Sequence, residues 1–250
     1  MRRFATYGMK QTCGIRVSRP TAQLLHKFWL SEPIQQVYHE RYNFELLDSA
    51  SYFLNQLERI SDPNFIPEEL DILYCRMPAS AAVTTSFSYG NVNLRISSIG
   101  GQSSQCRKWM HMFDDVRVVI FMVDLTTYAR KHFADKSKKE MHNVLRRFRE
   151  VARSNFLWHA SMLLFFNKTD LFDEMLTMKP LSECFPRCSG EKDVMACREC
   201  VRSVFIKAAE PRTSIVTHFT IATQTHNIGF AFSSCINMIL KHVIRNRTLL

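Results

Sequence analysis

Hydrophobic residues in the first part of the chain recur at helical spacing. The stretch TAQLLHKFWLSEPIQQVYHE (21–40) contains two groups of apolar residues at this spacing. The first is Leu24, Leu25, Phe28 and Trp29, and the second is Ile34, Val37 and Tyr38. In DSASYFLNQLERI (48–60), an Asp-Ser start precedes an apolar stripe. Prolines in SDPNFIP (61–67) then break the pattern. We therefore expect a helical region over 1–67 and a second domain over 68–250.

Beyond residue 67 the pattern changes to strands that alternate with helices. VTTSFSY and VNLRISSI alternate in polarity and are joined by Gly90-Asn91, which is a hairpin signal. VRVVIFMVDL and ASMLLFFNK are continuous apolar runs, as in strands that are buried on both faces. A helical pattern, KEMHNVLRRFREVARS, lies between them, and a last strand, IVTHFTIAT, precedes a closing helix, IGFAFSSCINMILKHVI. This order predicts an α/β fold with a mostly parallel sheet.

The balance of charge suggests an acidic partner. The net charge is +10, which suits nucleotide phosphates, an anionic membrane surface or nucleic acid. The densest basic run, RKHFADKSKKEMHNVLRRFRE, also contains acidic residues, so it indicates a solvated helix and not a nucleic-acid interface. The basic stretch before Glu32 has the composition of a mitochondrial import segment, but it has few serines and runs directly into the first helices. A cytoplasmic protein is therefore expected.

The cysteines leave one alternative open. In an intracellular chain they are expected to be free thiols. Cys184 and Cys188, followed by Cys197 and Cys200, form two close pairs that together could hold a tetrahedral zinc ion. The short gap between the pairs and the helical pattern of 194–204 favour separate thiols over a zinc site.

Short polar stretches follow three of the predicted strands. SIGGQ (98–102) follows the hairpin, NKTD (167–170) follows MLLFF, and TIAT (220–223) ends the last strand. Ligands of such sheets bind at the carboxyl ends of the strands, so these stretches are the candidate site. A carboxylate held there, such as that of Asp170, can accept two hydrogen bonds from the edge of a base such as guanine.

In this order and spacing, the stretches resemble those of a heterotrimeric G-protein alpha subunit. GGQSSQCRKWMHMFDDV is similar to the switch II segment, and FFNKTDLF and THFTIAT are similar to the two guanine-recognition segments. YNFELLDSASYFLNQLERISDPNFIPEELDIL resembles the end of an inserted helical domain and its return linker. The resemblance covers most of the chain, and it implies a Ras-like P-loop GTPase sheet preceded by the remainder of an all-helical inserted domain.

The resemblance implies roles for individual residues in binding GTP or GDP. Asn167 and Asp170 would recognise guanine, Lys168 would cover the base, and the Ala222 amide would face the guanine oxygen. As catalytic residues, Gln102 would orient the attacking water, and Arg76 would be an internal arginine finger, worth on the order of 10³–10⁵ in rate. The implied nucleotide contacts are Leu73, Ser98, Gly100, Gly101, Gln102, Asn167, Lys168, Thr169, Asp170 and Ala222.

Several features of the family are missing from the sequence. No G-x-x-x-x-G-K-[ST] phosphate loop occurs. The family's first strand, which would lie between the strands at about 92–98 and 117–124, also has no counterpart, and two sheet edges without partners would be an aggregation hazard. Ala79 and Ser98 occupy the positions of the magnesium ligands. Alanine offers no ligand, and a serine hydroxyl is poorer than a carboxylate, so no metal ligand is assigned.

The resemblance also implies partners and a location. These are the beta-gamma dimer, a G-protein-coupled receptor and an effector, with peripheral attachment at the cytoplasmic face of the plasma membrane and no nucleic acid. The implied partner contacts are Lys108, Trp109, His111, Leu249 and Leu250.

Two interpretations follow from these matches and departures. The first is a signalling alpha subunit that binds GTP and GDP, with magnesium expected for the family and weak hydrolysis in this chain. The second is a non-catalytic pseudo-GTPase that keeps its partner surfaces. A zinc-bearing or nucleic-acid-binding module is a third alternative, supported only by the cysteine pairs and the positive charge.

Overall fold

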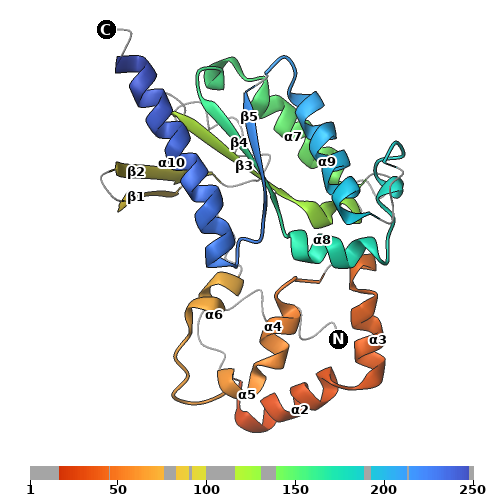
Figure 1. The fold of residues 1–250 in the computed structure, drawn as a ribbon. Helices are drawn as coiled ribbons and strands as arrows, with labels where there is room; N and C mark the ends of the chain where they lie inside the picture. Colours follow the sequence, from red (N-terminus) through yellow and green to blue (C-terminus); the bar gives the residue numbers. More distant parts are fainter. Residues whose placement is uncertain are drawn as a thin grey trace. The chain divides into compact units, whose positions relative to one another are not determined.

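The computed structural model describes residues 17–44, 46–75, 83–89, 92–99, 116–130, 139–188, 193–212 and 214–247. The chain divides into two compact units, Met1–Arg76 and Met77–Leu250 (Figure 1). The sequence places a boundary after residue 67. In the structure the division falls later, because a short helix that follows the proline-containing segment belongs to the first unit.

The described part of the first unit is helical, as its sequence predicts. Its elements are α2 (Arg19–Trp29), α3 (Glu32–His39), η1 (Arg41–Asn43), α4 (Ala50–Asn55), α5 (Leu57–Ile60) and α6 (Glu69–Tyr74). Ser18 caps α2, since its hydroxyl accepts a hydrogen bond from the Thr21 amide. The buried Trp29 donates its indole N–H to Asn55 at 2.7 Å, which joins α2 to α4.

A buried carboxylate joins α6 to the preceding helices. Asp71 accepts two hydrogen bonds from the Arg59 guanidinium, at 2.6 and 2.9 Å, and one from the Tyr52 hydroxyl at 2.9 Å. It also accepts the Glu68 amide at 2.7 Å, at the start of α6. The Arg59 guanidinium therefore holds the pKa of Asp71 well below its usual range. These bonds explain why α6 belongs to the first unit.

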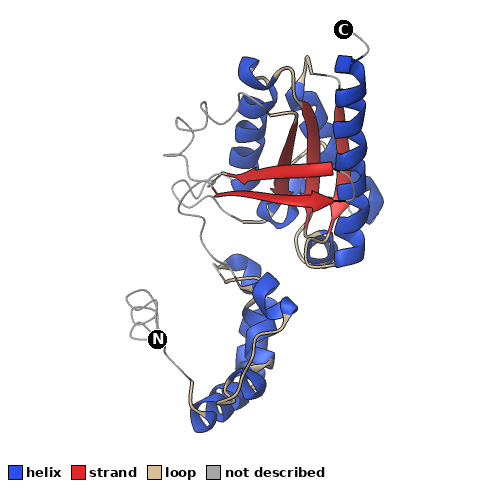
Figure 2. Cartoon of the chain, turned by 90° about the vertical axis from the view of Figure 1, so that its left-hand side faces the viewer, coloured by secondary structure: helices blue, strands red, loops and turns tan. Residues whose placement is uncertain are grey.

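The second unit is an α/β unit with two separate sheets in its described part (Figure 2). β1 (Val83–Tyr89) and β2 (Val92–Ser98) form an antiparallel hairpin. β3 (Val118–Asp124), β4 (Ser161–Asn167) and β5 (Ile215–Thr220) form a parallel sheet in the order β3-β4-β5. Among the described strands, β2 pairs only with β1, and β3 pairs only with β4.

Helices lie on both faces of the parallel sheet (Figure 1). On one face, α7 (Glu140–Ala152) and α9 (Val194–Ala209) supply the buried rings of Phe148 and Phe205, which contact Phe121 of β3 and Phe166 of β4. On the other face, α10 (Thr225–Arg247) packs Ala231 and Cys235 against Leu163 and Phe165 of β4. The shorter elements are η4 (Leu125–Tyr128), η5 (Asn155–Leu157), α8 (Thr169–Leu176) and η6 (Leu181–Glu183).

The two continuous apolar strands differ in burial. β4 is buried from Met162 to Phe166, as expected for a strand covered on both faces. The same expectation is wrong for β3, where Ile120 and Met122 are 38% and 49% exposed. Val118 at the start of β3 packs against the cluster that α10 forms with β4, and among the described strands β3 pairs with β4 alone. Ile120 and Met122 are therefore left partly exposed.

The cysteines also depart from expectation. Cys188 and Cys200 form a disulfide with their Cα atoms 5.9 Å apart, so free thiols were the wrong expectation for this pair. Cys184 and Cys197 are buried outside this bond, and burial raises the pKa of Cys184 to about 12. Within the described ranges, no three metal-binding side chains are grouped to hold an ion. The disulfide uses two of the four cysteines that the zinc alternative requires. The disulfide forms because the segment after η6 places Cys188 next to Cys200 of α9.

Candidate functional site

The carboxyl ends of the three parallel strands carry polar residues in register. Asp124 is the last residue of β3, Asn167 of β4 and Thr220 of β5. Asp124 pairs with Asn167, and Asn167 pairs with Thr220, as direct neighbours across the strands. The parallel pairing therefore aligns three polar residues along the carboxyl ends of the strands, where open α/β sheets bind their ligands.

Asn167 links β4 to the segment that follows β5. Its side-chain oxygen accepts the Ala222 amide at 2.9 Å and the Thr220 hydroxyl at 3.3 Å. A second contact at the same place runs from the buried Thr169 hydroxyl to the Thr220 carbonyl at 3.4 Å. Asn167 is not a helix cap, because the N-cap of α8 is Lys168. The structure thus brings together the NKTD and TIAT stretches, as the resemblance implies.

Lys168 links β4 to β3. Its ammonium donates a hydrogen bond to Asp124 at 2.7 Å, and the two side chains are 31% and 26% exposed. The other Asp124 oxygen accepts the Thr126 amide at 2.9 Å and the Thr126 hydroxyl at 2.6 Å. Together with the Asn167 contacts, this ion pair connects the ends of all three strands.

The charges around Asp124 keep it ionised. Burial raises the pKa of this carboxyl group, but the positive charges of Lys168 and Arg130 and the hydrogen bonds from Lys168 and Thr126 outweigh it. The net effect is a pKa below the usual value. Arg130 contributes from 4.0 Å, at the end of the segment that follows η4.

Asp170 lies in the first turn of α8, and its side chain is exposed. It is thus a solvent-facing carboxylate three residues after Asn167, just beyond the left-handed Lys168. A carboxylate in this place can accept a pair of N–H donors from a planar base. The bond between the Ala222 amide and Asn167 is formed without a ligand.

Two further candidate residues belong to other elements. Ser98 is exposed at the end of β2, opposite Val83, and Leu73 belongs to α6 of the first unit. The other predicted nucleotide, catalytic and magnesium positions lie outside the described residues: Arg76, Ala79, Gly100, Gly101 and Gln102. So do the predicted partner contacts: Lys108, Trp109, His111, Leu249 and Leu250.

The described residues do not fit a magnesium site. Mg²⁺ prefers carboxylate and phosphate oxygens in octahedral geometry, and Ser98 offers only a hydroxyl. Asp124, the carboxylate nearest to the strand ends, already has both of its oxygens in hydrogen bonds to Lys168 and Thr126. No step of a reaction is therefore assigned to a metal at these residues.

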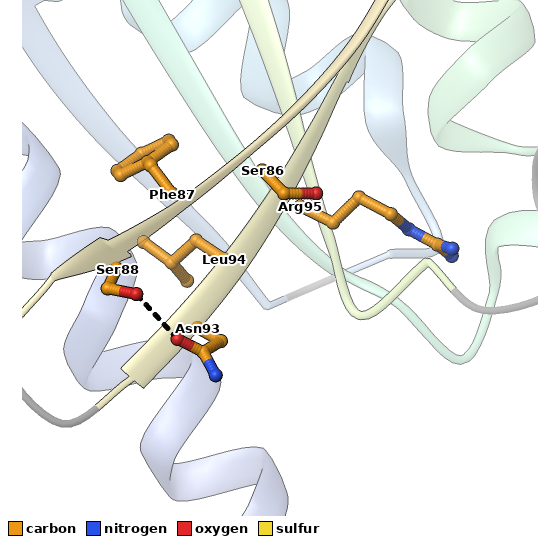
Figure 3. Close-up of a pocket in the computed structure, with 6 residues that line it drawn as sticks. All are labelled: Ser86, Phe87, Ser88, Asn93, Leu94 and Arg95. Carbon is orange, nitrogen blue, oxygen red and sulfur yellow. Dashed lines mark hydrogen bonds between the residues drawn. The ribbon is translucent and has the colours of Figure 1, made fainter.

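An open hollow of about 350 Å³ lies on the hairpin (Figure 3). Its lining residues are Ser86, Phe87, Ser88, Asn93, Leu94 and Arg95. The Ser88 hydroxyl donates to Asn93 at 2.7 Å across the two strands. None of these residues is a predicted contact of a nucleotide, and none belongs to β3, β4 or β5.

Sequence reasoning missed two parts of this site. One is Asp124, whose signal is a single charged residue at the end of an otherwise apolar strand. The other is Asn227 of α10, whose side chain accepts the Ile221 amide at 2.8 Å and so holds the segment before Ala222. Asn227 has no such signal, because the bond depends on the turn between β5 and α10.

The geometry defines an open α/β protein with a candidate ligand site at the carboxyl ends of its parallel strands. The G-protein alpha subunit family matches residues 5–239, and the chain belongs to this family. It is 38% identical, over 91% of its length, to the guanine nucleotide-binding protein alpha-14 subunit of Caenorhabditis briggsae, and 37% identical, over 93%, to that of Caenorhabditis elegans. It is 33% identical over 90% of its length to the alpha-4 subunit of Caenorhabditis briggsae.

The chain spans only part of these curated relatives. The aligned regions cover 59%, 61% and 64% of the three relatives, respectively. No helix in the described part of the chain combines the length and the apolar character needed to cross a membrane.

Proposed function

We propose that this chain binds guanine nucleotides as the alpha subunit of a heterotrimeric G protein. The observation that carries the proposal is the set of bonds at the ends of β4 and β5. Asn167 is fixed by the Ala222 amide, and Asp170 is exposed one turn further on. A guanine base offers N7 and O6 as acceptors and N–H groups as donors. The Asn167 amide and the Asp170 carboxylate are complementary to these groups.

The proposed binding is dominated by the base. The contacts proposed at the ends of β4 and β5, Asn167, Asp170 and Ala222, would all meet the base. Catalysis of phosphoryl transfer depends on positioning and charge neutralisation. With Ser98 and Ala79 at the two magnesium positions, we propose that GTP hydrolysis by this chain is weak.

The test is competition between nucleotides for the full chain. A fluorescent GDP analogue is titrated, and unlabelled GDP and ADP are then used to displace it with and without Mg²⁺. We expect GDP to compete at least 10-fold better than ADP, and Mg²⁺ to have little effect on affinity. Asp170→Asn should remove the preference for guanine, because one acceptor oxygen becomes a donor. Glu150→Gln, which removes a charge from the exposed Arg146–Glu150 pair on α7, is the matched control.

Two outcomes would change this proposal. Equal competition by GDP and ADP, or no binding of either, would contradict guanine recognition. Tight, strongly Mg²⁺-dependent binding of a non-hydrolysable GTP analogue, together with GTP hydrolysis, would contradict weak activity and support a working GTPase.

A second candidate is a non-catalytic pseudo-GTPase that acts through its partners. It is favoured by the serine at position 98 and the alanine at position 79, which leave the family's magnesium site without a carboxylate. Its partners would be a beta-gamma dimer, a receptor and an effector, at the cytoplasmic face of the plasma membrane. Beta-gamma association that is equal with GDP, with a GTP analogue and without nucleotide would support this candidate. Association that requires GDP would contradict it.

A further inference from the structure

The ion pair between Asp124 and Lys168 lies beside the proposed guanine contacts. It joins the end of β3 to the residue that immediately follows β4, with 2.7 Å between the Lys168 ammonium and one Asp124 oxygen. The second Asp124 oxygen is held by the amide and hydroxyl of Thr126. The carboxylate is therefore fixed on both oxygens, and it gives the lysine ammonium a defined position.

The backbone of Lys168 supports this arrangement. Its φ of 63° lies in the left-handed region, and no other non-glycine residue in the described ranges has a positive φ. Such a conformation is unfavourable for a residue with a Cβ atom, so the surrounding contacts must maintain it. The turn at Lys168 separates Asn167, which is bonded toward β5, from Thr169 and Asp170, which begin α8. The Lys168 side chain reaches in the other direction, toward β3.

We propose that Asp124 is a positioning residue of the base site. It holds the Lys168 side chain in place, so that the methylene groups of the lysine form a wall against the face of a bound purine. Asp124 does not read the base. A free lysine side chain has many rotamers, and one that is fixed before binding does not have to be ordered by the ligand. This inference rests on the guanine-nucleotide binding proposed above.

A purely structural role for Asp124 would use its other oxygen. That oxygen accepts two bonds from Thr126 at the start of η4, and it would do so whether or not Lys168 were present. The two roles can be separated by substitution. Asp124→Asn keeps an acceptor for Thr126 but removes the charge that attracts the ammonium. Lys168→Met keeps an apolar chain of similar length but removes the ammonium.

The first experiment is a double-mutant cycle on nucleotide affinity in the full chain. Asp124→Asn should weaken the binding of GDP and of inosine diphosphate by the same factor, roughly 3- to 10-fold, because a wall acts on either base. In the Lys168→Met background, the same Asp124→Asn substitution should have no further effect. The preference for GDP over inosine diphosphate, which lacks the 2-amino group, should persist in Asp124→Asn and be lost in Asp170→Asn. Glu150→Gln is again the control.

The second experiment needs no nucleotide. Lys168 is acylated with an amine-reactive reagent, and its rate of modification is followed by mass spectrometry of the full chain. Asp124→Asn should increase the rate at Lys168 several-fold, because an ammonium held in an ion pair is protected, whereas Glu150→Gln should not change it.

The outcomes separate the two proposals. An unchanged acylation rate, or an equal effect of Asp124→Asn with and without the Lys168 ammonium, overturns the role of Asp124 even if guanine nucleotides bind. Normal GDP affinity in Asp124→Asn also overturns it. If the native chain binds no purine nucleotide, the proposed function is wrong. The positioning role of Asp124 is then wrong too, whatever the acylation rate of Lys168.

Discussion

Replacing Asn167 tests whether one side chain both stabilises the strand ends and binds the ligand. In Asn167→Ala, two hydrogen bonds lose their acceptor. Ala222 is exposed, so its amide can bond to water instead, and losing its hydrogen bond to Asn167 costs about 1 kcal/mol. The Thr220 hydroxyl belongs to a residue that is only 1% exposed, and a buried hydroxyl without a partner costs about 1–3 kcal/mol.

The expected loss is therefore about 2–4 kcal/mol of the free energy of unfolding of the α/β unit. For a unit of this size it corresponds to a fall in Tm of roughly 4–16 °C. Asn167→Asp is the informative partner variant. It keeps an acceptor oxygen for Ala222 and Thr220, so its Tm should fall much less, but it removes the amide donor that would bind N7 of guanine.

Differential scanning calorimetry of both variants, together with GDP titration, measures the two effects. We expect Asn167→Ala to lose stability and affinity, and Asn167→Asp to lose mainly affinity. The reasoning is refuted if Asn167→Ala melts within about 1 °C of the native chain, since the predicted loss is several times larger. It is also refuted if Asn167→Asp melts as low as Asn167→Ala.

Further predictions concern the core, the pH dependence of stability and the disulfide. Phe205→Ala, at a fully buried ring between α9 and the sheet, should cost about 3–5 kcal/mol in urea unfolding, whereas Phe156→Ala, at a 57% exposed position, should cost about 0.5 kcal/mol. Burial lowers the pKa of His218, so the unfolded chain binds a proton more readily. The free energy of unfolding should therefore decrease as the pH falls from about 6.5 to the lowered pKa of the folded state. Thermal melts of His218→Phe should lack this pH dependence. Reduction of the Cys188–Cys200 bond, which closes a short loop, should cost about 2–3 kcal/mol in melts with and without a reducing agent, and a Cys200→Ser variant should be insensitive to the reductant.

Much of the α/β unit is predictable from its sequence, because strands and helices there have clear periods. β4 is an unbroken apolar run that is buried from Met162 to Phe166. The two runs of alternating polarity that precede it in the sequence form the antiparallel pair β1 and β2. The burial of β3 was not predictable in the same way. Its apolar run is as continuous as that of β4, and the exposure of Ile120 and Met122 depends on which strands and helices lie beside it.

The candidate site was predictable only in part. NKTD and TIAT are local motifs, so their positions at the ends of β4 and β5 follow once the strands are recognised. The bond from Ala222 to Asn167 spans 55 residues, and the ion pair from Lys168 to Asp124 spans 44 residues. Such contacts depend on strand order and register, which a local pattern does not contain. The disulfide between Cys188 and Cys200 is similar, since four nearby cysteines allow several pairings.

The matched register of Asp124, Asn167 and Thr220 links ligand binding to the correct pairing of the three strands. A slip of one residue in any of these strands would turn its end residue to the opposite face of the sheet and break the cross-strand bonds at once. A ligand held at this edge would then bind only chains in which all three strands are correctly aligned. By mass action, such a ligand would enrich the correctly paired sheet over every misaligned form. Ligand affinity would thus report the accuracy of folding as well as the chemistry of recognition.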